Sequence, residues 1–143
     1  MLKTLRVAAI LRRALIVASV AIFGSCALPE PRSVSDESLC VRYGNNIRAN
    51  DPQRAAAIGA EMERRGLRID DLDVTHIQRQ IVRVGMTTCA MRAAWGHSSV
   101  DNRTTTARAV RIQHVWRGFT GQYVRTRSSF VYTENGIVVA VQD

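Results

Sequence analysis

Three cysteines are the residues of this 143-residue chain whose chemistry depends most on position. A cysteine thiol can be acylated, can form a disulfide, or can be buried as a small apolar side chain. Cys26 directly follows an uncharged apolar run, whereas Cys40 and Cys89 lie far apart in the remainder of the chain. The segment before Cys26 therefore decides which of these reactions is available.

The apolar run before Cys26 covers residues 14–23, follows basic residues and ends at two small residues. This order of basic, apolar and small residues is typical of a secretory signal peptide. A transmembrane helix needs about 20 apolar residues, which is twice this length. The alternative, an uncleaved anchor that starts near Val7, would bury Arg12 and Arg13 at about 2.5–3.5 kcal/mol each near the bilayer centre.

The four residues Phe23-Gly24-Ser25-Cys26 resemble the box at which bacterial lipoproteins are processed. In such proteins the cysteine is acylated, with palmitate among the usual chains, and becomes the first residue of the mature protein. Residues 1–25 are thus predicted to be a signal peptide. Residues 26–33, which contain two prolines, are predicted to be an extended, lipidated tether. We expect a lipoprotein of the cell envelope that faces the periplasm, in the outer membrane.

Acylation of Cys26 would leave Cys40 and Cys89 as an even pair in an oxidising compartment, where a disulfide is expected. Such a bond would stabilise the fold by about 4 kcal/mol in the chain-entropy model. The alternative is two buried free thiols that act as small apolar side chains.

The remaining residues offer no recognisable catalytic or metal-binding motif. The three histidines are His76, His97 and His114. They are scattered, and none has a zinc-like spacing to a cysteine or carboxylate. Asp70, Asp71 and Asp73 could form a carboxylate cluster for calcium, but helix capping explains them more simply. We expect no metal, no cofactor and no enzymatic activity.

The charge of the chain is less basic than its total suggests. The net charge of +8 includes the basic residues of the predicted signal peptide. Without that segment every cation is an arginine, because Lys3 is the sole lysine. Arginine binds phosphate well, yet export from the cytoplasm argues against a nucleic-acid partner. Trp95 and Trp116 could anchor a partner, but a chain with 6% aromatic residues needs them in its core.

Capping and stop signals predict four helices, over residues 36–43, 52–65, 71–80 and 88–95. Gly44 is expected to end the first helix. The apolar stripe of the second is Ala55, Ile58, Gly59 and Met62, and that of the third segment is Val74, Ile77, Ile81 and Val84. The fourth helix is nearly all apolar and must be buried, with Cys89 on a face that Cys40 could reach.

The last third of the chain is predicted to form a sheet. Residues 97–106 look like a polar loop, and the chain then alternates between apolar and polar residues. The inward-facing sets are expected to be Val110, Ile112, His114 and Trp116 in the first strand and Val124, Thr126, Ser128, Phe130 and Tyr132 in the second. Asn135-Gly136 predicts a tight hairpin into a third strand, residues 137–141. The sequence therefore predicts one α+β domain, residues 34–143, with N-terminal helices packed on a three-stranded antiparallel meander.

Residues 81–143 resemble the SmpA/OmlA, or BamE-like, family of small outer-membrane lipoproteins. The resemblance rests on Val84-Gly85-Met86-Thr87, a short helix that ends at Gly96, a strand with Trp116, and Phe130-Val131-Tyr132 turning through Asn135-Gly136. The helical part, residues 34–80, is outside it. The family's two-helix, three-strand layout is also similar to the repeats of the β-lactamase inhibitor protein.

This resemblance implies a role beside the outer membrane. Members of the family assist β-barrel assembly or hold envelope components together through protein and lipid contacts, so the expected partners are the membrane and envelope proteins. The likeness to the inhibitor layout implies an alternative, a binder that inhibits a periplasmic enzyme.

Overall fold

The structure is a computed structural model that describes residues 31–120, 123–124 and 128–142. The predicted signal peptide and Cys26 lie outside the described residues. In chain order the elements are η1 (Pro31–Ser33), α1 (Asp36–Arg48), α2 (Pro52–Arg64), α3 (Asp71–Gln78), α4 (Thr88–Trp95), β1 (Val100–Thr105), β2 (Val110–Trp116), β3 (Phe119–Thr120), β4 (Tyr123–Val124), β5 (Ser129–Glu134) and β6 (Ile137–Gln142). The predicted α+β class is confirmed.

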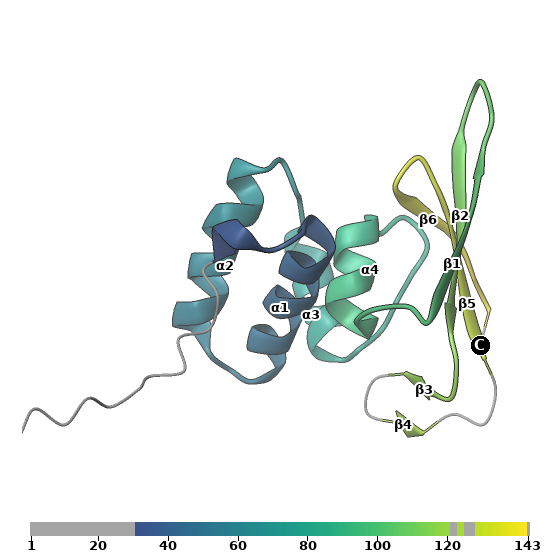
Figure 1. The fold of residues 1–143 in the computed structure, drawn as a ribbon. Coiled ribbons are helices and arrows are strands. Elements are labelled where there is room, and N and C mark those ends of the chain that lie inside the picture. The colour runs from purple at the N-terminus through teal and green to yellow at the C-terminus, as the bar shows by residue number, and fades with distance from the viewer. Residues whose placement is uncertain (1–30, 121–122, 125–127, 143) are drawn as a thin grey trace, which may run out of the picture.

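The helices lie on one side of the sheet, with α4 next to it and α2 furthest away (Figure 1). The main sheet has the order β1-β2-β5-β6, and every neighbouring pair is antiparallel. Strands β3 and β4 form a separate small pair. Of the residues that the structure describes, no helix has the length and apolarity needed to span a bilayer.

The predicted three-stranded sheet is wrong in its strand number, because β1 is a fourth strand within the predicted polar loop 97–106. All six residues of β1 are exposed, so no apolar alternation marks it in the sequence. It pairs with β2 along its whole length, from Val100 opposite Val115 to Thr105 opposite Val110. Backbone pairing, not burial of side chains, forms this strand.

The inward-facing set predicted for the second strand is also wrong. In β5 the buried residues are Ser129, Val131 and Thr133, whereas Phe130 and Tyr132 point to the opposite face. Because Ser129 and Thr133 are polar but face inward, the sequence of β5 does not show which face is buried. Val124 lies in β4, opposite Phe119, and Thr126 is outside the described residues. The hairpin at Asn135-Gly136 is confirmed, with both φ angles positive, at 50° and 83°.

Helix α1 continues through Gly44 to Arg48, so the predicted stop at Gly44 is wrong. Gly44 is buried because α1 crosses α4 there. A Cβ on Gly44 would lie 1.8 Å from the carbonyl oxygen of Ala93. The glycine therefore permits a close helix crossing and does not act as a cap.

The boundaries of α2 and α4 follow their capping signals closely. Asp51 accepts a hydrogen bond from the Arg54 N–H, and Thr87 accepts one from the Ala90 N–H. The N–H of Leu67 donates to the Met62 carbonyl after Gly66, at φ 72°, which closes α2. These bonds confirm the predicted starts of α2 and α4 and the end of α2.

Helix α3 ends at Gln78, close to the predicted end at residue 80, and the apolar stripe does not continue beyond it. Ile77 is fully buried, but Ile81 and Val84 are exposed because the helix ends at Gln78. Beyond that point Val82 and Met86 turn inward instead. The predicted stripe of the third segment is therefore right only within the helix.

Two clusters of buried side chains make the core. One joins α4 to the sheet and contains Trp95 and Trp116, whose rings meet edge to face at a centroid distance of 5.2 Å. The other lies between α1 and α2, around Leu39 and Met62, and reaches Cys89 on α4. Both tryptophans are thus core residues.

Candidate functional site

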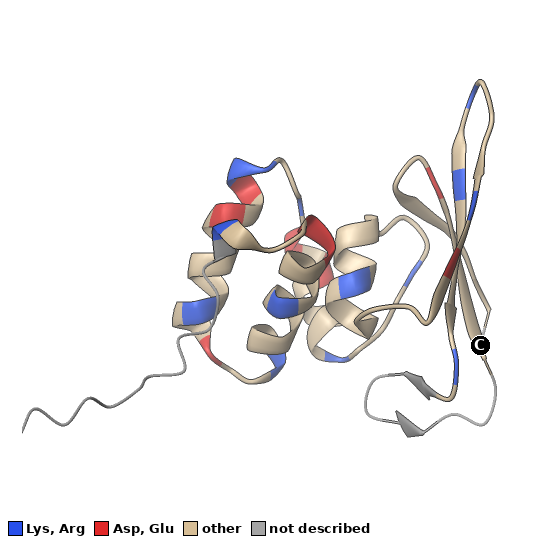
Figure 2. Ribbon diagram, in the orientation of Figure 1, with Lys and Arg blue, Asp and Glu red and all other residues tan. Residues whose placement is uncertain are grey.

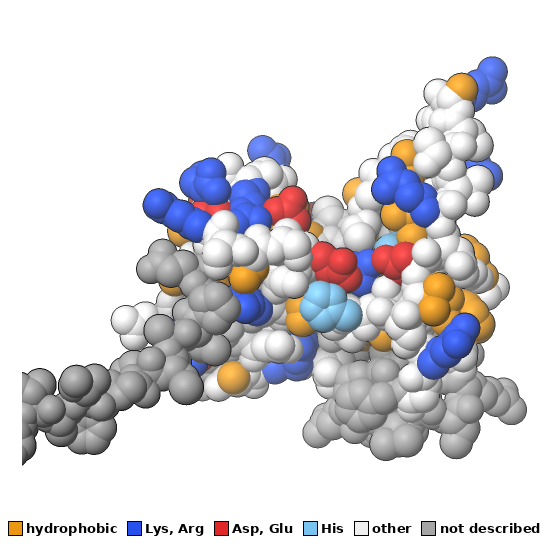
Figure 3. Space-filling view, viewed as in Figure 1, with side chains coloured by type: hydrophobic (Ala, Val, Ile, Leu, Met, Phe, Trp, Pro, Cys, Tyr) orange, Lys and Arg blue, Asp and Glu red, His pale blue; other side chains and the backbone are white. Residues whose placement is uncertain are grey.

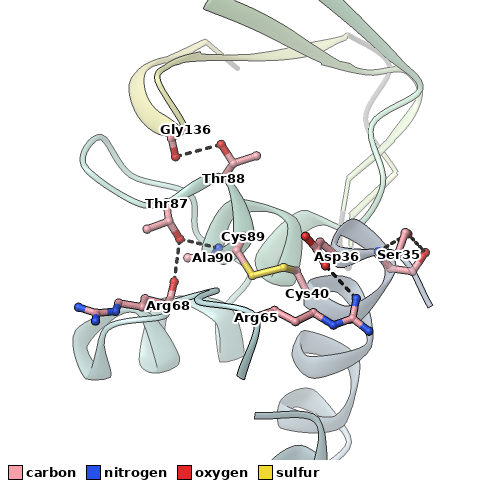
Figure 4. Close-up of a disulfide and its surroundings, with 11 residues drawn as sticks. Ser35, Asp36, Cys40, Arg65, Arg68, Thr87, Thr88, Cys89, Ala90 and Gly136 are labelled. Atoms are coloured by element: carbon pink, nitrogen blue, oxygen red, sulfur yellow. Dashed lines mark hydrogen bonds and ion pairs between the residues drawn. A yellow bond between two sulfur atoms is a disulfide. The ribbon is translucent and has the colours of Figure 1, made fainter. Parts of the chain in front are cut away.

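The disulfide joins the first and the fourth helix of the helical layer. Cys40 of α1 and Cys89 of α4 are bonded, 49 positions apart in sequence, with a Cα–Cα distance of 5.3 Å (Figure 4). Both cysteines are buried. The predicted pairing is therefore present, and it holds the N-terminal helix against the helix that contacts the sheet.

Hydrogen bonds around the disulfide connect neighbouring segments to the same region. Thr87 Oγ1 donates to the carbonyl of Arg68, and Thr88 Oγ1 donates to the carbonyl of Gly136 in the β5–β6 turn (Figure 4). Arg65 Nη1 lies 2.8 Å from Asp36 Oδ1 at the start of α1. The disulfide thus lies among contacts that connect α1, the segment after α2, α4 and the β5–β6 turn.

A network of polar side chains lies between the helical layer and the sheet. We call it the interlayer network, and its members are Glu37, Arg92, Ser98, Asp101, His114 and Thr133. Arg92 of α4 is only 5% exposed. Its Nη1 lies 2.6 Å from Glu37 Oε1 on α1, and its Nη2 contacts Asp101 Oδ2 on β1. One buried guanidinium therefore connects α1, α4 and the sheet. Figure 3 shows acidic and histidine side chains gathered in this region.

His114 is held at both ring nitrogens. Its Nδ1 lies 2.7 Å from Asp101 Oδ1, and its Nε2 lies 3.1 Å from Thr133 Oγ1. The carboxylate can only accept, so Nδ1 carries the proton, and Nε2 accepts from the threonine hydroxyl. These bonds define one neutral tautomer of His114.

The network shifts two pKa values. Burial lowers the pKa of His114 below its usual 6.5, and this effect outweighs the favourable contact with Asp101. Burial by itself raises the pKa of Asp101. The hydrogen bonds from Ser98 and His114, with the charge of Arg92, outweigh that effect and lower it overall. Asp101 is therefore ionised beside a neutral imidazole at neutral pH.

The order Asp101, His114, Thr133 has the connectivity of a hydrolase triad, but its burial is different. His114 and Thr133 are each 1% exposed, so a substrate cannot reach the hydroxyl. The hydroxyl of Ser98 donates to Asp101 and not to the histidine. Within the described part of the chain, no group of three His, Cys, Asp or Glu side chains is arranged to hold a metal. The network is suited to fixing the sheet against the helices.

The sheet face that points away from the helices is the candidate binding surface, and we call it the outer face. A row of hydrogen-bonded side chains crosses it, one from each strand: Asn102, Gln113, Tyr132 and Gln142. Asn102 Nδ2 donates to Gln113 Oε1 at 3.0 Å, and Gln113 Nε2 donates to Tyr132 Oη at 2.9 Å. Tyr132 Oη lies 3.3 Å from Gln142 Oε1. This polar row presents amide and hydroxyl groups in fixed positions.

A groove of about 530 Å³ runs along the polar row. Its wall includes Arg111 and Glu134, which form an ion pair of 3.0 Å, and the exposed apolar side chain of Val139. Such a mixture of apolar contact and oriented polar groups is typical of surfaces that bind another molecule. The β1–β2 hairpin extends beyond the other strands and carries basic residues (Figures 1 and 2).

The residues singled out in the sequence have several different environments. Asp70 begins α3 without a side-chain cap bond. Asp73 is buried and forms a 2.6 Å ion pair with Arg83, so capping does not explain it. His76 bonds to the Leu72 carbonyl of its own helix, and His97 lies 3.0 Å from Glu37. The structure thus brings only His114 into the interlayer network among the residues proposed for chemistry, with His97 at its rim.

Sequence reasoning missed Arg92 and the polar row. Arg92 is the one charge in an otherwise apolar helix, and that isolation was a usable signal for a buried ion pair. The polar row falls at alternating strand positions, but β1 was not recognised as a strand. Its first member, Asn102, therefore had no predicted face.

Comparison with known proteins adds no relative to this picture. No family model matches the chain, and no curated protein or solved structure matches it significantly.

Proposed function

We propose that this chain is a non-enzymatic, lipid-anchored module of the bacterial envelope that binds envelope proteins through its outer face. The observation that carries the proposal is the groove over the polar row, on a sheet face that the described helices leave open. The interlayer network fixes the strands from the other side. The outer face can therefore present its side chains without rearrangement, which lowers the entropic cost of binding.

Two further observations support the proposed location in the bacterial envelope. A disulfide between α1 and α4 is suited to an oxidising compartment such as the periplasm. Over residues 81–143 a short buried helix ended by Gly96 precedes an antiparallel meander. This order resembles the BamE-like layout, with β1 as an additional strand. An accessory role in β-barrel assembly or envelope integrity follows from that resemblance.

The anchor is tested with Cys26→Ser and cell fractionation. One acyl chain binds a membrane only marginally, whereas two or more anchor it stably. We expect the wild-type protein in the membrane fraction with an acylated mature N-terminus by mass measurement, and the variant without acyl mass. A variant that remains in the membrane as the wild type does, or a wild-type chain that begins with Met1, would refute the lipid anchor.

The binding face is tested by affinity capture from envelope extracts. Val139 is 49% exposed and lines the groove, so Val139→Arg obstructs the groove without disturbing the core. The matched control is Leu72→Arg, at a 73% exposed apolar position on α3. Loss of captured proteins with Val139→Arg but not with Leu72→Arg supports the proposal.

The identity of the captured proteins separates the alternatives. Enrichment of β-barrel assembly proteins supports the envelope role. Enrichment of a single soluble hydrolase at equal stoichiometry favours the inhibitor alternative. Equal capture by the wild type and both variants excludes the outer face as the binding site.

A further inference from the structure

The two edges of the main sheet differ in a way that the proposed function does not explain. The edge at β6 is covered over its first residues by residues 85–88: the Gly85 N–H donates to the Val138 carbonyl, and the Val138 N–H donates to the Met86 carbonyl. A bridge between Thr87 and Ile137 continues this pairing. At the other edge, β1 has no strand partner on its outer side among the described residues.

The hydrogen-bond pattern shows which groups of β1 face outward. The Asn135 N–H donates to the Val110 carbonyl, so the even-numbered residues of β2 bond to β5 and its odd-numbered residues bond to β1. Gln113 therefore forms a hydrogen-bonded pair with Asn102, and the other odd-numbered residues of β2 do the same with the even-numbered residues of β1. The N–H and carbonyl groups of Asp101, Arg103 and Thr105 point away from the sheet.

The outward positions carry opposite charges two residues apart. If a second β1 paired antiparallel with the first, hydrogen-bonded pairs would join outward residues only. A register that pairs Asp101 or Arg103 with its own copy would place like charges directly opposite, which destabilises a sheet. The register centred on Asn102 instead places Asp101 opposite Arg103 of the other copy, twice. The charges of β1 therefore favour one self-complementary register.

We propose that β1 is a self-association edge, at which two copies of this chain pair antiparallel about a two-fold axis at Asn102 and form one eight-stranded sheet. Each copy contributes the same strand, as a closed two-fold interface requires. The Asp101 side chain is 35% exposed, its Oδ1 accepts from Ser98 and His114, and its Oδ2 contacts Arg92. A carboxylate oxygen has two lone pairs, so Oδ2 has a second acceptor site that Arg103 of the other copy would use. This inference is independent of the partner proposed for the outer face.

The surroundings of β1 are compatible with this pairing. All six β1 residues are exposed, and although Arg92 of α4 contacts the Asp101 side chain, the outer backbone edge of β1 has no strand partner among the described residues. The two Asn102 side chains would meet on the outer face and join the two polar rows. Strand pairing alone buries less area than the 1,200 Å² or so of small stable interfaces, so the pair is expected to be weak and dependent on concentration.

The register is tested by disulfide trapping of the full chain in bacterial cells, with copper phenanthroline as oxidant. In the proposed register Asn102 faces Asn102 as a non-hydrogen-bonded pair, with Cα atoms about 4.5 Å apart, which a disulfide can span. We expect Asn102→Cys to give a crosslinked dimer on a non-reducing gel. Thr104→Cys is the matched control, because its two copies would lie about 14 Å apart along the strands. The wild type measures any background from Cys26.

A second substitution tests the role of charge. Arg103→Asp in the Asn102→Cys background replaces two attractive pairs with two repulsive ones, and we expect the crosslinked fraction to fall about tenfold. Arg103→Lys should retain it. Melting temperatures of all variants check that each is folded. Equal crosslinking of the two cysteine variants, a folded Asn102→Cys chain that stays monomeric while its thiol reacts with maleimide, or no effect of Arg103→Asp would each overturn the proposal.

Discussion

Gly44 of α1 and Ala93 of α4 lie so close that a Cβ on the glycine would fall 1.8 Å from the alanine carbonyl oxygen. The obstacle is backbone, which cannot turn aside as a flexible side chain can. Gly44→Ala should therefore destabilise the fold by about 3 kcal/mol or more, measured by chemical denaturation.

The control for this prediction is Gly59→Ala on α2, where the added Cβ would lie 3.7 Å from Tyr43 Cε2, an ordinary contact. Alanine is the better helix former by about 1 kcal/mol, so this variant should be unchanged or stabilised. Similar losses in both variants would contradict the close crossing as the cause.

Removal of the disulfide with Cys40→Ala and Cys89→Ala together should cost about 4 kcal/mol, since it releases a loop of 49 positions in the unfolded chain. Thermal denaturation with and without reductant measures this. Reductant should lower the melting temperature of the wild type and leave the double variant unaffected. Identical wild-type curves under both conditions would mean that the bond contributes nothing.

Because of His114, we expect the folded protein to lose stability in mild acid. Its pKa in the folded protein is below 6.5 because the ring is buried, so the unfolded chain binds the proton more readily. This contribution is fully present above pH 6.5 and declines as the pH falls toward the folded-state pKa. His114→Gln should remove that part of the pH dependence of the free energy of unfolding. A wild-type slope that persists in the variant would assign it to other groups.

Because of Glu61, we expect a separate loss of folding stability at lower pH. Hydrogen bonds from Arg64 and then Arg65 lower its pKa from 4.5 to about 2. Its contribution is present above pH 4.5 and is lost as the pH falls from 4.5 to 2. Glu61→Gln should flatten the acid limb of the stability curve.

Glu63→Gln is the control for Glu61, because Glu63 lies on the same helix with an exposed side chain. It should leave the acid limb as it is in the wild type. If both variants flatten the curve equally, the effect belongs to the general charge of α2.

The parts of the fold that follow from local chemistry could be predicted from the sequence. Ser35, Asp51 and Thr87 cap helices because their side chains accept nearby backbone N–H groups. Asn135-Gly136 makes its hairpin because both residues tolerate positive φ. The bond between Cys40 and Cys89 could be predicted because the predicted compartment is oxidising and the predicted face of the fourth helix allows Cys89 to reach Cys40.

The parts that depend on distant neighbours could not be predicted in this way. Gly44 looks like a helix stop until Ala93 is placed beside it. β1 looks like a loop because its residues are polar and exposed, and its pairing with β2 becomes visible only in the folded chain. Arg92 and Asp101 join only when α4 is placed over the sheet, so the interlayer network has no local signature.

The cover that residues 85–88 provide over β6 limits how copies of this chain can join. A sheet with two unpaired edge strands can add a further molecule at each edge and grow into a fibre. Here the start of β6 is already paired with the chain's own backbone, whereas β1 has no outer strand partner among the described residues, so strand addition is favoured at β1. Pairing of β1 with β1 uses the same edge of both molecules, and it therefore favours a closed pair over a growing fibre.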